Sequence, residues 1–579
     1  MSVSHRGVSV SGRADASLTS SAQPSTETVR ATFGLDLRQV VRLLTGALWM
    51  YWAQAWINVS GVVPLGAALA AISAAGSLCI MGAAIMVRGR EAEARVDRFI
   101  LVACLGQVAL QIVVQSSGHG YGSDELAFNQ TAASLLLHGT NPYGASFAYS
   151  LRQFGVGWGT LTLSGQMVSS MSYPALSVLF YVPASLLLGA GTDGGLVTDA
   201  LFWVIGGVLL WRMAGPALRP YVPLLLMLPI PLIFVAGGAT DPLYLPFVLI
   251  AVWRWDRFGD PDESSPARWI GPIALGIACC VKQTPWLLVP FLVTGVAIES
   301  QLRGRSWFAA GTRYALLCGA AFLVPNLAFI AWNPGAWLTA VLLPLRSALV
   351  PLGIGPAELV SAYGLGGGDM GLFGFAGALL TLATLVIFVR KYERLKLLFP
   401  LLPLCGVLFE SRSLESYFIF LIPILLVTAT SVTATPWKAW GRRTTLGLTA
   451  GGGALAAVSV VLLLGALIDR PPLTMTVQHG HVSSSLLVTD MTVANTGTEP
   501  VDVHFLLALD GTAEQLMRVT AGPAVLSAGA HASYTVEATG QTPLPSAGYP
   551  FQIELTSTDP DILLATPQLT VGVGGGIAG

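Results

Sequence analysis

Charged residues are scarce in this chain of 579 residues: only 11% are Asp, Glu, Lys or Arg, whereas 53% are hydrophobic. Soluble domains carry about a quarter charged residues, so the composition excludes a soluble globular protein. The 30 basic and 31 acidic residues leave a net charge of -1, without the positive field that holds nucleic acid. The composition therefore predicts a membrane protein that has no nucleic-acid partner.

Cysteine is also rare, and none of it falls in the polar C-terminal region. The six cysteines all lie in apolar runs without metal-ligand spacing, so we expect neither a disulfide framework nor a cysteine metal site. Residues 1–37 are rich in Ser, Thr and Arg and lack the apolar stretch of a cleavable secretion signal. This segment is typical of a disordered cytoplasmic tail.

Long apolar segments follow one another from about residue 40 to 468. A bilayer core about 30 Å thick needs roughly 20 helical residues to cross it. We expect a polytopic α-helical membrane protein with an N-terminal transmembrane hairpin at 38–98 and a larger transmembrane domain at 99–468. The expected spans are thirteen, near 40–59, 63–87, 99–115, 197–213, 220–237, 241–254, 269–281, 284–298, 314–332, 370–389, 397–409, 413–430 and 445–468.

A further apolar run, 173–188, would invert the later topology if it crossed the membrane. Five clusters of basic residues would then move outside, against the positive-inside rule. We therefore place this run along the outer leaflet, within an outer loop at 116–196; a second external loop spans about 333–369. The prediction is a multi-pass protein of the cell membrane with a cytoplasmic N-terminus.

The C-terminal region changes character. Apolar and polar residues alternate in runs such as SSLLVTDMTVANTG and PFQIELTST, which are separated by Gly, Pro and Asn. This period-two pattern predicts an extracytoplasmic β-sandwich domain at 469–579.

Several apolar segments are too short to reach the outer surface, which places polar residues within the membrane. A helix over 269–281 rises only about 20 Å, so Lys282 lies below the outer headgroups. It either snorkels or pairs with a carboxylate, or it meets an anionic ligand in a wet cavity. Asp241 stands at another outward turn, in GGATDPLYLP. Both residues are expected at a similar depth.

A third outward turn, LFESRSLESYFIF, carries Glu410, Arg412 and Glu415. These residues form a local Arg–Glu pair or contribute to a shared site. In the outer loop, Asp124 and Glu125 begin a short interfacial helix that ends before Asn141. Asp124 either caps this helix or acts chemically. The convergence of charges from separate turns on one side of the membrane favours a common site.

At these residues the chain resembles the integral-membrane glycosyltransferases of the GT-C class, particularly bacterial polyprenyl-phosphate-dependent mannosyl- and arabinosyltransferases. The order of four motifs within about 99–430 carries the resemblance. They are SDE followed by GTNPYG, the stretch SYPALSVLFYVPASLLLG with Ala175 where a second proline is common, GGATDPLYLPFVLIAVWR, and GIACCVKQTPWLLVP.

The resemblance implies transfer of a sugar from a polyprenyl-phosphate donor to an envelope glycan or glycolipid acceptor on the outer face, with inversion. Asp124 is the implied catalytic base, with Glu125 as its alternative. Lys282 and Arg412 would bind the donor phosphate. The implied substrate-binding residues are Asp241, Tyr143, Tyr173 and Glu410.

Some members of the class bind a divalent metal through a DxD motif, which the outer loop lacks, so no cofactor is expected, and a divalent metal is the alternative. Membrane lipids surround the protein in either case. The competing function is a transporter or flippase of a lipid-linked or polar solute, for which many spans and buried charges are equally ordinary. A non-catalytic protein of envelope assembly is the third alternative. The absence of visible inverted repeats and the long outer loop favour the transferase.

Overall fold

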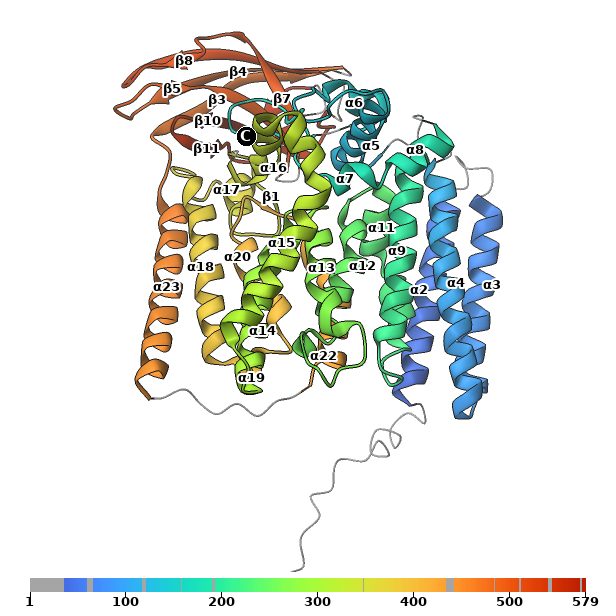
Figure 1. Ribbon diagram of the computed structural model, residues 1–579. Helices are drawn as coiled ribbons and strands as arrows, with labels where there is room; N and C mark the ends of the chain where they lie inside the picture. Colours follow the sequence, from blue (N-terminus) through green and yellow to red (C-terminus); the bar gives the residue numbers. More distant parts are fainter. Residues whose placement is uncertain are drawn as a thin grey trace, which may run out of the picture.

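The computed structural model describes residues 36–59, 66–116, 121–157, 159–189, 193–346, 348–433, 442–483, 485–509, 512–539, 544–572 and 575–578. The tail expected to be disordered lies almost entirely outside these residues. Figure 1 shows an array of helices with a β domain at one end, and the short helices of the outer loop lie beside that domain. The long apolar segments up to residue 468 thus form a helical region, and the alternating segments after it form a β-sheet.

Among the described residues, six helical stretches are long and apolar enough to cross a membrane. They indicate a multi-pass membrane protein. They are Gly66–Met86 (α3), Gly194–Met213 (within α9, Asp193–Met213), Thr284–Leu302 (η2, Thr284–Leu288, with α14, Val289–Leu302), Trp307–Trp332 (α15), Gly371–Arg390 (α18) and Leu446–Ile468 (within α23, Arg442–Ile468).

The long helices expose many large apolar side chains, which is unfavourable in contact with water. In α15, Leu316 and Val324 are 68% and 66% exposed, and in α23 Val461 is 66% exposed. Large contiguous apolar surfaces of this kind are normally covered by lipid or by a partner. The exposed surface of these helices therefore fits contact with acyl chains.

The N-terminal hairpin is tied to the rest of the helical region by buried polar contacts. It consists of α2 (Leu37–Val59) and α3, and α4 (Arg90–Ser116) follows it. Arg42 of α2 donates to Asp97 of α4 at 2.6 Å, and both side chains are buried. Trp52 donates through its indole nitrogen to the backbone oxygen of Met227. The hairpin therefore packs as part of one helical array.

The sequence predicted thirteen continuous spans, but several of these segments are broken in the structure. The segment near 220–237 forms two short helices, and 397–409 forms one 3-10 turn and a four-residue helix. Proline explains the breaks, because it lacks the backbone N–H and clashes with the preceding turn. The short elements are α10 (Tyr221–Leu226), α11 (Pro229–Gly237), α12 (Asp241–Val252), η1 (Trp255–Arg257), α13 (Ala267–Cys279), α19 (Tyr392–Leu395), η3 (Phe399–Leu401), α20 (Leu404–Val407), α21 (Glu415–Ile419) and α22 (Leu421–Ser431).

The segments expected outside the membrane are built from short elements as well. The ambiguous run at 173–188 forms α7 (Leu176–Leu179) and α8 (Val182–Leu188), which are too short to span a bilayer. They lie near the end of the array that carries the β domain (Figure 1). The other outer elements are α5 (Asp124–Leu137), α6 (Ala148–Gln153), α16 (Pro334–Arg346), β1 (Leu352–Gly353), α17 (Glu358–Tyr363) and β2 (Arg412–Ser413).

The C-terminal domain is an antiparallel sheet that curls on itself, in place of the two separate sheets of a sandwich. Within the described residues its order is β13-β12-β10-β6-β7-β9-β4-β3, and β11 pairs with β10. An isolated bridge between His481 and Gly576 brings the two ends of the sheet together. The strands are β3 (Leu473–Val482), β4 (Leu486–Asn495), β5 (Val501–Asp502), β6 (His504–Leu509), β7 (Thr512–Ala521), β8 (Val525–Leu526), β9 (His531–Thr539), β10 (Pro550–Thr558), β11 (Asp561–Ala565), β12 (Leu569–Val571) and β13 (Ile577–Ala578).

The β domain is docked on the outer segments through a shared apolar core. Leu506 and Leu563 of the sheet are buried in one cluster with Leu161 of the outer loop and Val360 of α17. The backbone N–H of Leu563 also donates to the oxygen of Gly367 at 3.0 Å. Gly367 has a φ of +90°, and a Cβ there would lie 2.1 Å from that leucine's carbonyl oxygen. Only glycine permits this close approach.

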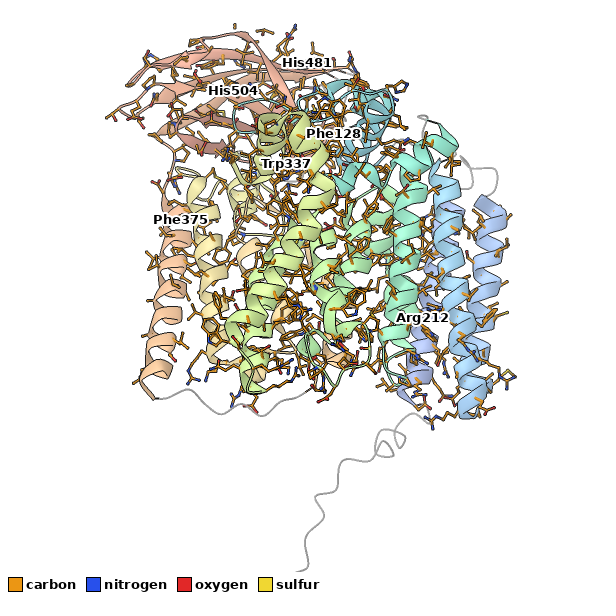
Figure 2. All side chains as sticks on the ribbon, in the orientation of Figure 1. Phe128, Arg212, Trp337, Phe375, His481 and His504 are labelled. Atoms are coloured by element: carbon orange, nitrogen blue, oxygen red, sulfur yellow. The ribbon has the colours of Figure 1, made fainter. Side chains whose placement is uncertain are left out.

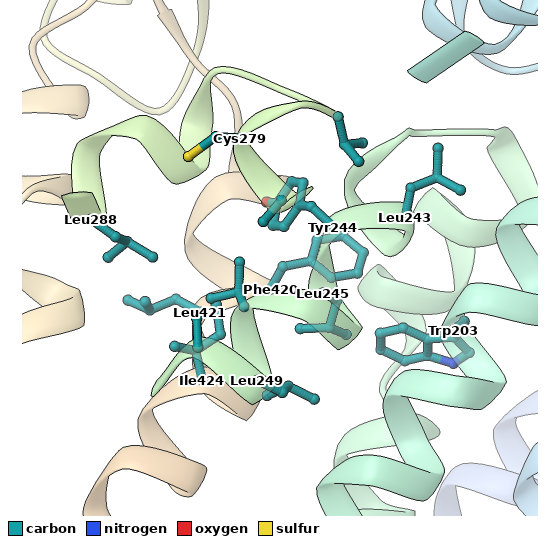
Figure 3. Close-up of a cluster of buried hydrophobic side chains, with 14 of the residues drawn as sticks. Trp203, Leu243, Tyr244, Leu245, Leu249, Cys279, Leu288, Phe420, Leu421 and Ile424 are labelled. Atoms are coloured by element: carbon teal, nitrogen blue, oxygen red, sulfur yellow. The ribbon is translucent and has the colours of Figure 1, made fainter. Parts of the chain in front are cut away.

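The centre of the helical region is a continuous apolar core. Figure 3 shows part of it, where side chains of α9, α12, α13 and α21–α22 meet, including Trp203, Leu245, Cys279 and Phe420. The rings of Trp203 and Phe420 meet edge to face with centroids 5.6 Å apart. This packing fixes α12 and α21, the helices that carry two of the predicted site segments.

Candidate functional site

Helix α5 places two adjacent carboxylates in its first turn. Ser123 caps the helix, because its Oγ accepts a hydrogen bond from the backbone N–H of Leu126. Asp124 therefore does not serve as the cap, which was the alternative explanation for this residue. Its side chain and that of Glu125 instead make contacts with segments far away in the sequence.

Glu125 is the centre of a dense hydrogen-bond network. Its carboxylate accepts from Lys282 Nζ at 2.9 and 3.1 Å and from the hydroxyl of Tyr173 at 2.7 Å. Thr240 donates to it through its backbone N–H at 3.1 Å and its hydroxyl at 2.9 Å. Burial alone would raise the pKa of Glu125, but Lys282 and the other donors lower it to about 2. Glu125 is consequently ionised and fully engaged.

Lys282 lies between two carboxylates. Besides Glu125, its ammonium group donates to Asp241 Oδ2 at 3.0 Å, and its side chain is only 3% exposed. The hydroxyl of Tyr244 donates to the other oxygen of Asp241 at 2.7 Å. The ring of Tyr417 lies 5.2 Å from the ammonium nitrogen. Lys282 therefore pairs with carboxylates of the protein, which was one of the two explanations for its position.

Asp124 belongs to a second polar chain beside the first. The backbone N–H and the hydroxyl of Thr160 donate to Asp124 Oδ2 at 2.9 and 2.8 Å. Arg412 Nη2 in turn donates to the hydroxyl of Thr160 at 2.9 Å. Within the part of the chain that the structure describes, Asp124 Oδ1 accepts no hydrogen bond. That oxygen is the one available to a proton from a bound molecule.

The pKa of Asp124 is raised above its usual value. Burial is the largest cause, the ionised Glu125 adds to it, and Thr160 and Arg412 oppose it. A carboxylate with a raised pKa holds a proton more readily, which suits a general base. The two adjacent carboxyl groups therefore differ, since Glu125 has a lowered pKa and Asp124 a raised one.

Arg412 borders a cavity between the helical region and the β domain. It lies on β2, which pairs in parallel with β1 so that Arg412 stands opposite Leu352. The cavity has a volume of about 200 Å³, comparable to a single sugar ring, and strand β7 supplies part of its wall. It is lined by Gly159, Leu161, Val350, Pro351, Leu352, Arg412, Thr512 and Ala513.

Tyr143, Tyr173 and Glu410 are the other residues predicted at the site, and they differ in what they contact. Tyr143 is 2% exposed, and its hydroxyl donates to the backbone oxygen of Tyr173 at 2.9 Å. Tyr143 therefore helps to position Tyr173. Tyr173 itself contacts Glu125 and lies 5.7 Å from Lys282 Nζ. Glu410 is exposed, and its carboxylate lies over α18 instead of beside Arg412.

The local Arg–Glu pair expected at the third turn is absent from the described residues. Arg412 makes no ion pair there with Glu410 or Glu415, and it reaches into the outer loop instead. No group of three His, Cys, Asp or Glu side chains in the described ranges is placed to hold a metal ion. The polar atoms at the site are thus carboxylates, hydroxyls, one ammonium and one guanidinium group.

The sequence interpretation missed three residues that complete the site. Thr160 joins Asp124 to Arg412, Thr240 binds Glu125, and Tyr417 lies over Lys282. Thr240 directly precedes Asp241, so its position at the same turn was a usable signal. Thr160 stands in a loop without periodicity and gave no such signal.

An apolar cleft adjoins the ion cluster on its membrane side. Tyr244 and Tyr417, whose rings lie next to Asp241 and Lys282, form one end of it. Its other walls are apolar side chains and prolines of the membrane helices: Val248, Pro285, Leu287, Leu288, Pro400, Pro403, Leu404, Phe420, Leu421 and Ile424, with Thr284. The site therefore combines a polar side with an apolar one.

Comparisons with protein-family models, with curated proteins and with solved structures find no match for this chain. The function is therefore inferred from the geometry of the site and from the motifs that the sequence carries.

Proposed function

We propose that the chain is an integral-membrane glycosyltransferase of the GT-C type. It would take a sugar from a polyprenyl-phosphate donor and transfer it to a glycan or glycolipid acceptor on the outer face of the membrane. The observation that carries the proposal is the chain Asp124–Thr160–Arg412 at the edge of a cavity between the helical region and the β domain. It links a carboxylate base, through Thr160, to a cation that borders the cavity.

The reaction would be a single displacement. The acceptor hydroxyl oxygen attacks C1 of the donor sugar, and its proton passes to Asp124 Oδ1. The bond between C1 and the phosphate oxygen breaks, and its electron pair leaves with polyprenyl phosphate. Arg412 stabilises the charge that develops on the leaving phosphate, since a guanidinium group binds phosphate through two parallel hydrogen bonds. The configuration at C1 would invert.

Lys282 and Glu125 take positioning roles in this proposal. The ammonium group neutralises Glu125 and Asp241 and holds α5, α12 and the turn after α13 together. Arg412, which is half-buried and borders the cavity, is the cation within reach of a donor phosphate. Tyr173 and Asp241 would contact the sugar only after a rearrangement of these bonds. Glu410 would act on the acceptor from the outer surface.

The apolar cleft below Tyr244 and Tyr417 matches the isoprenoid part of the donor in chemistry, but its volume of about 30 Å³ means that its walls would have to move apart to admit a lipid chain. Its walls are aliphatic side chains and prolines, and it begins next to the ion cluster. A lipid chain in this cleft would place its phosphate near the polar side of the site. The proposed orientation puts the N-terminus in the cytoplasm and the β domain outside, in agreement with the distribution of basic residues.

The proposal is tested with the purified full chain, a labelled polyprenyl-phosphate sugar and an envelope glycan extract. Asp124→Asn should lower sugar transfer about 10²- to 10⁴-fold while leaving the folded protein intact. Glu415→Gln, an exposed carboxylate on the neighbouring outward turn, is the matched control and should retain activity. Full activity in Asp124→Asn would refute the proposed base. A transporter or flippase would move the lipid donor without releasing free polyprenyl phosphate.

A further inference from the structure

The end of the helical region opposite the β domain carries a group of basic residues, four of which pair with carboxylates. Figure 1 shows α14, α19 and α22 at this end, and Arg212 marks the same end in Figure 2. Arg254 pairs with Glu263 at 2.6 Å. The other pairs are Arg257 with Asp260, Arg303 with Asp256, Asp260 and Glu299, and Lys396 with Asp256 and Glu299.

Arg268 and Arg313 differ from these neighbours. Both side chains are exposed, and within the described ranges neither forms an ion pair. Of the acidic residues in the same loop, Asp260 pairs with Arg257 and Arg303, Glu263 pairs with Arg254, and the exposed Asp262 forms no ion pair within the described residues. The charge of these two guanidinium groups is therefore not compensated by the protein.

The two arginines border a hollow of about 470 Å³, together with Gly259, Ser264 and Trp269. This volume is within the range of small-molecule sites. The hollow has a fixed frame, because Gly259 donates its backbone N–H to the oxygen of Arg268 at 2.8 Å. The guanidinium carbon of Arg313 lies 5.9 Å from the ring centroid of the buried Phe258. The two cations consequently face a preformed space.

Exposed aromatic residues place this hollow at the membrane surface. Trp269 opens α13 and is 47% exposed, and Trp307 and Phe308 open α15 with 56% and 66% exposure. Trp side chains at the ends of apolar helices are typical of the boundary between acyl chains and headgroups. Lipid phosphates lie at this level.

We infer that the hollow bordered by Arg268 and Arg313 binds a phosphate group, and that an anionic phospholipid of the adjoining leaflet supplies it. Guanidinium groups bind phosphate oxygens with paired hydrogen bonds, and Ser264 adds a hydroxyl donor. Basic pockets between membrane helices are known to hold anionic headgroups. The acyl chains would lie along the exposed apolar surfaces of α13 and α15. This site is remote from Asp124 and does not depend on the proposed transfer reaction.

The inference is tested by native mass spectrometry of the full chain, released from nanodiscs of phosphatidylcholine with a minor share of phosphatidylglycerol. The wild-type chain should retain phosphatidylglycerol selectively. Arg268→Ala and Arg313→Ala should each lower this retention about fivefold. Arg394→Ala removes an exposed arginine of α19, at the same end but outside the hollow, and should leave retention unchanged.

Two further measurements separate the outcomes. The double variant Arg268→Lys/Arg313→Lys keeps the charge but loses the planar fork, so it should retain less lipid than the wild type and more than the alanine variants. Inorganic phosphate added at millimolar concentration identifies the source: displacement of the lipid would mean that the same site accepts a soluble phosphate, and no displacement would mean that it requires the lipid. Equal retention in wild type and alanine variants, or an equal loss in Arg394→Ala, would overturn the inference.

Discussion

Lys282 joins Glu125 to Asp241, residues that are 116 positions apart in the sequence, through hydrogen bonds of 2.9 and 3.0 Å. The three residues begin or follow three different helices, so this contact fixes the relative positions of α5, α12 and α13. It also neutralises charge inside a region from which water is largely excluded. The consequences of removing either partner are therefore structural as well as chemical.

Lys282→Met should destabilise the protein strongly, because it leaves two buried carboxylates without their cation. Breaking a buried pair in this way costs about 3–5 kcal/mol. Thermal unfolding in detergent measures the loss. The triple variant Lys282→Met/Glu125→Gln/Asp241→Asn removes all three charges and should recover part of the stability. If Lys282→Met were as stable as the wild type and only donor use were impaired, Lys282 would be a phosphate ligand instead.

Thr160→Val should move the acid side of the pH–rate profile to higher pH. Thr160 lowers the pKa of Asp124 by donating to its carboxylate, so its loss raises that pKa further. The base must be ionised to accept a proton, and activity therefore disappears at a higher pH than in the wild type. We expect kcat/KM near neutral pH to fall about tenfold. Thr162→Val, two residues along the same loop, is the control, and an unshifted profile in Thr160→Val would contradict the role of Thr160.

Filling the cavity from the β domain should impair acceptor use selectively. Ala513→Trp places a large ring into a space of about 200 Å³ that also borders Arg412. We expect the KM for the acceptor to rise about tenfold, since a steric block of this kind removes binding energy before the chemical step. Hydrolysis of the donor by water should continue. A parallel loss of both reactions would show that the β domain only supports the fold.

The docking of the β domain should weaken as the pH rises through neutrality. Glu358 of α17 is half-buried and Glu554 of β10 is fully buried. Burial raises the pKa of each carboxyl to about 7. Ser361 donates to Glu554, Glu358 adds repulsion to it, and Arg412 partly compensates Glu358. Both folded-state pKa values exceed the ordinary value near 4.5, so the folded form binds protons more tightly.

Stability from these two carboxyls is accordingly present at pH 5 and lost as the pH rises to 8. Hydrogen exchange of the β10 and β11 amides, corrected for its intrinsic pH dependence, should show faster opening at pH 8. Glu554→Gln should remove most of this dependence. Glu537→Gln, whose carboxylate pairs with Arg518 on the outside of the sheet, should not. A pH-independent interface in the wild type would contradict the prediction.

Much of the site was predictable because its polar residues interrupt apolar segments. Asp241 begins, and Lys282 follows, a segment too short to cross the membrane, and this shortness placed them at a common depth. The sequence could not show which carboxylate Lys282 would bind, because the order of helices in space is not written in their lengths. It also could not show that Thr160 joins Asp124 to Arg412, since that bond connects residues 252 positions apart.

The fold was predictable to a similar degree. Hydropathy located the long helices, but it does not register the missing N–H groups at Pro229 and Pro400, which break two expected spans into short helices. Alternation identified the strands of the C-terminal region. Whether they form two sheets or one curled sheet depends on pairing between distant strands, such as His481 with Gly576, which alternation alone does not specify.

The connection between α23 and β3 is very short. Helix α23 ends at Ile468 and β3 begins at Leu473, with Pro471 and Pro472 between them. The backbone oxygen of Asp469 is also bound by the N–H of Gly368 at 2.9 Å. A fully extended chain covers at most about 3.6 Å per residue, so the β domain cannot move more than a small distance from the bilayer. A molecule that binds the β domain must therefore do so close to the membrane surface.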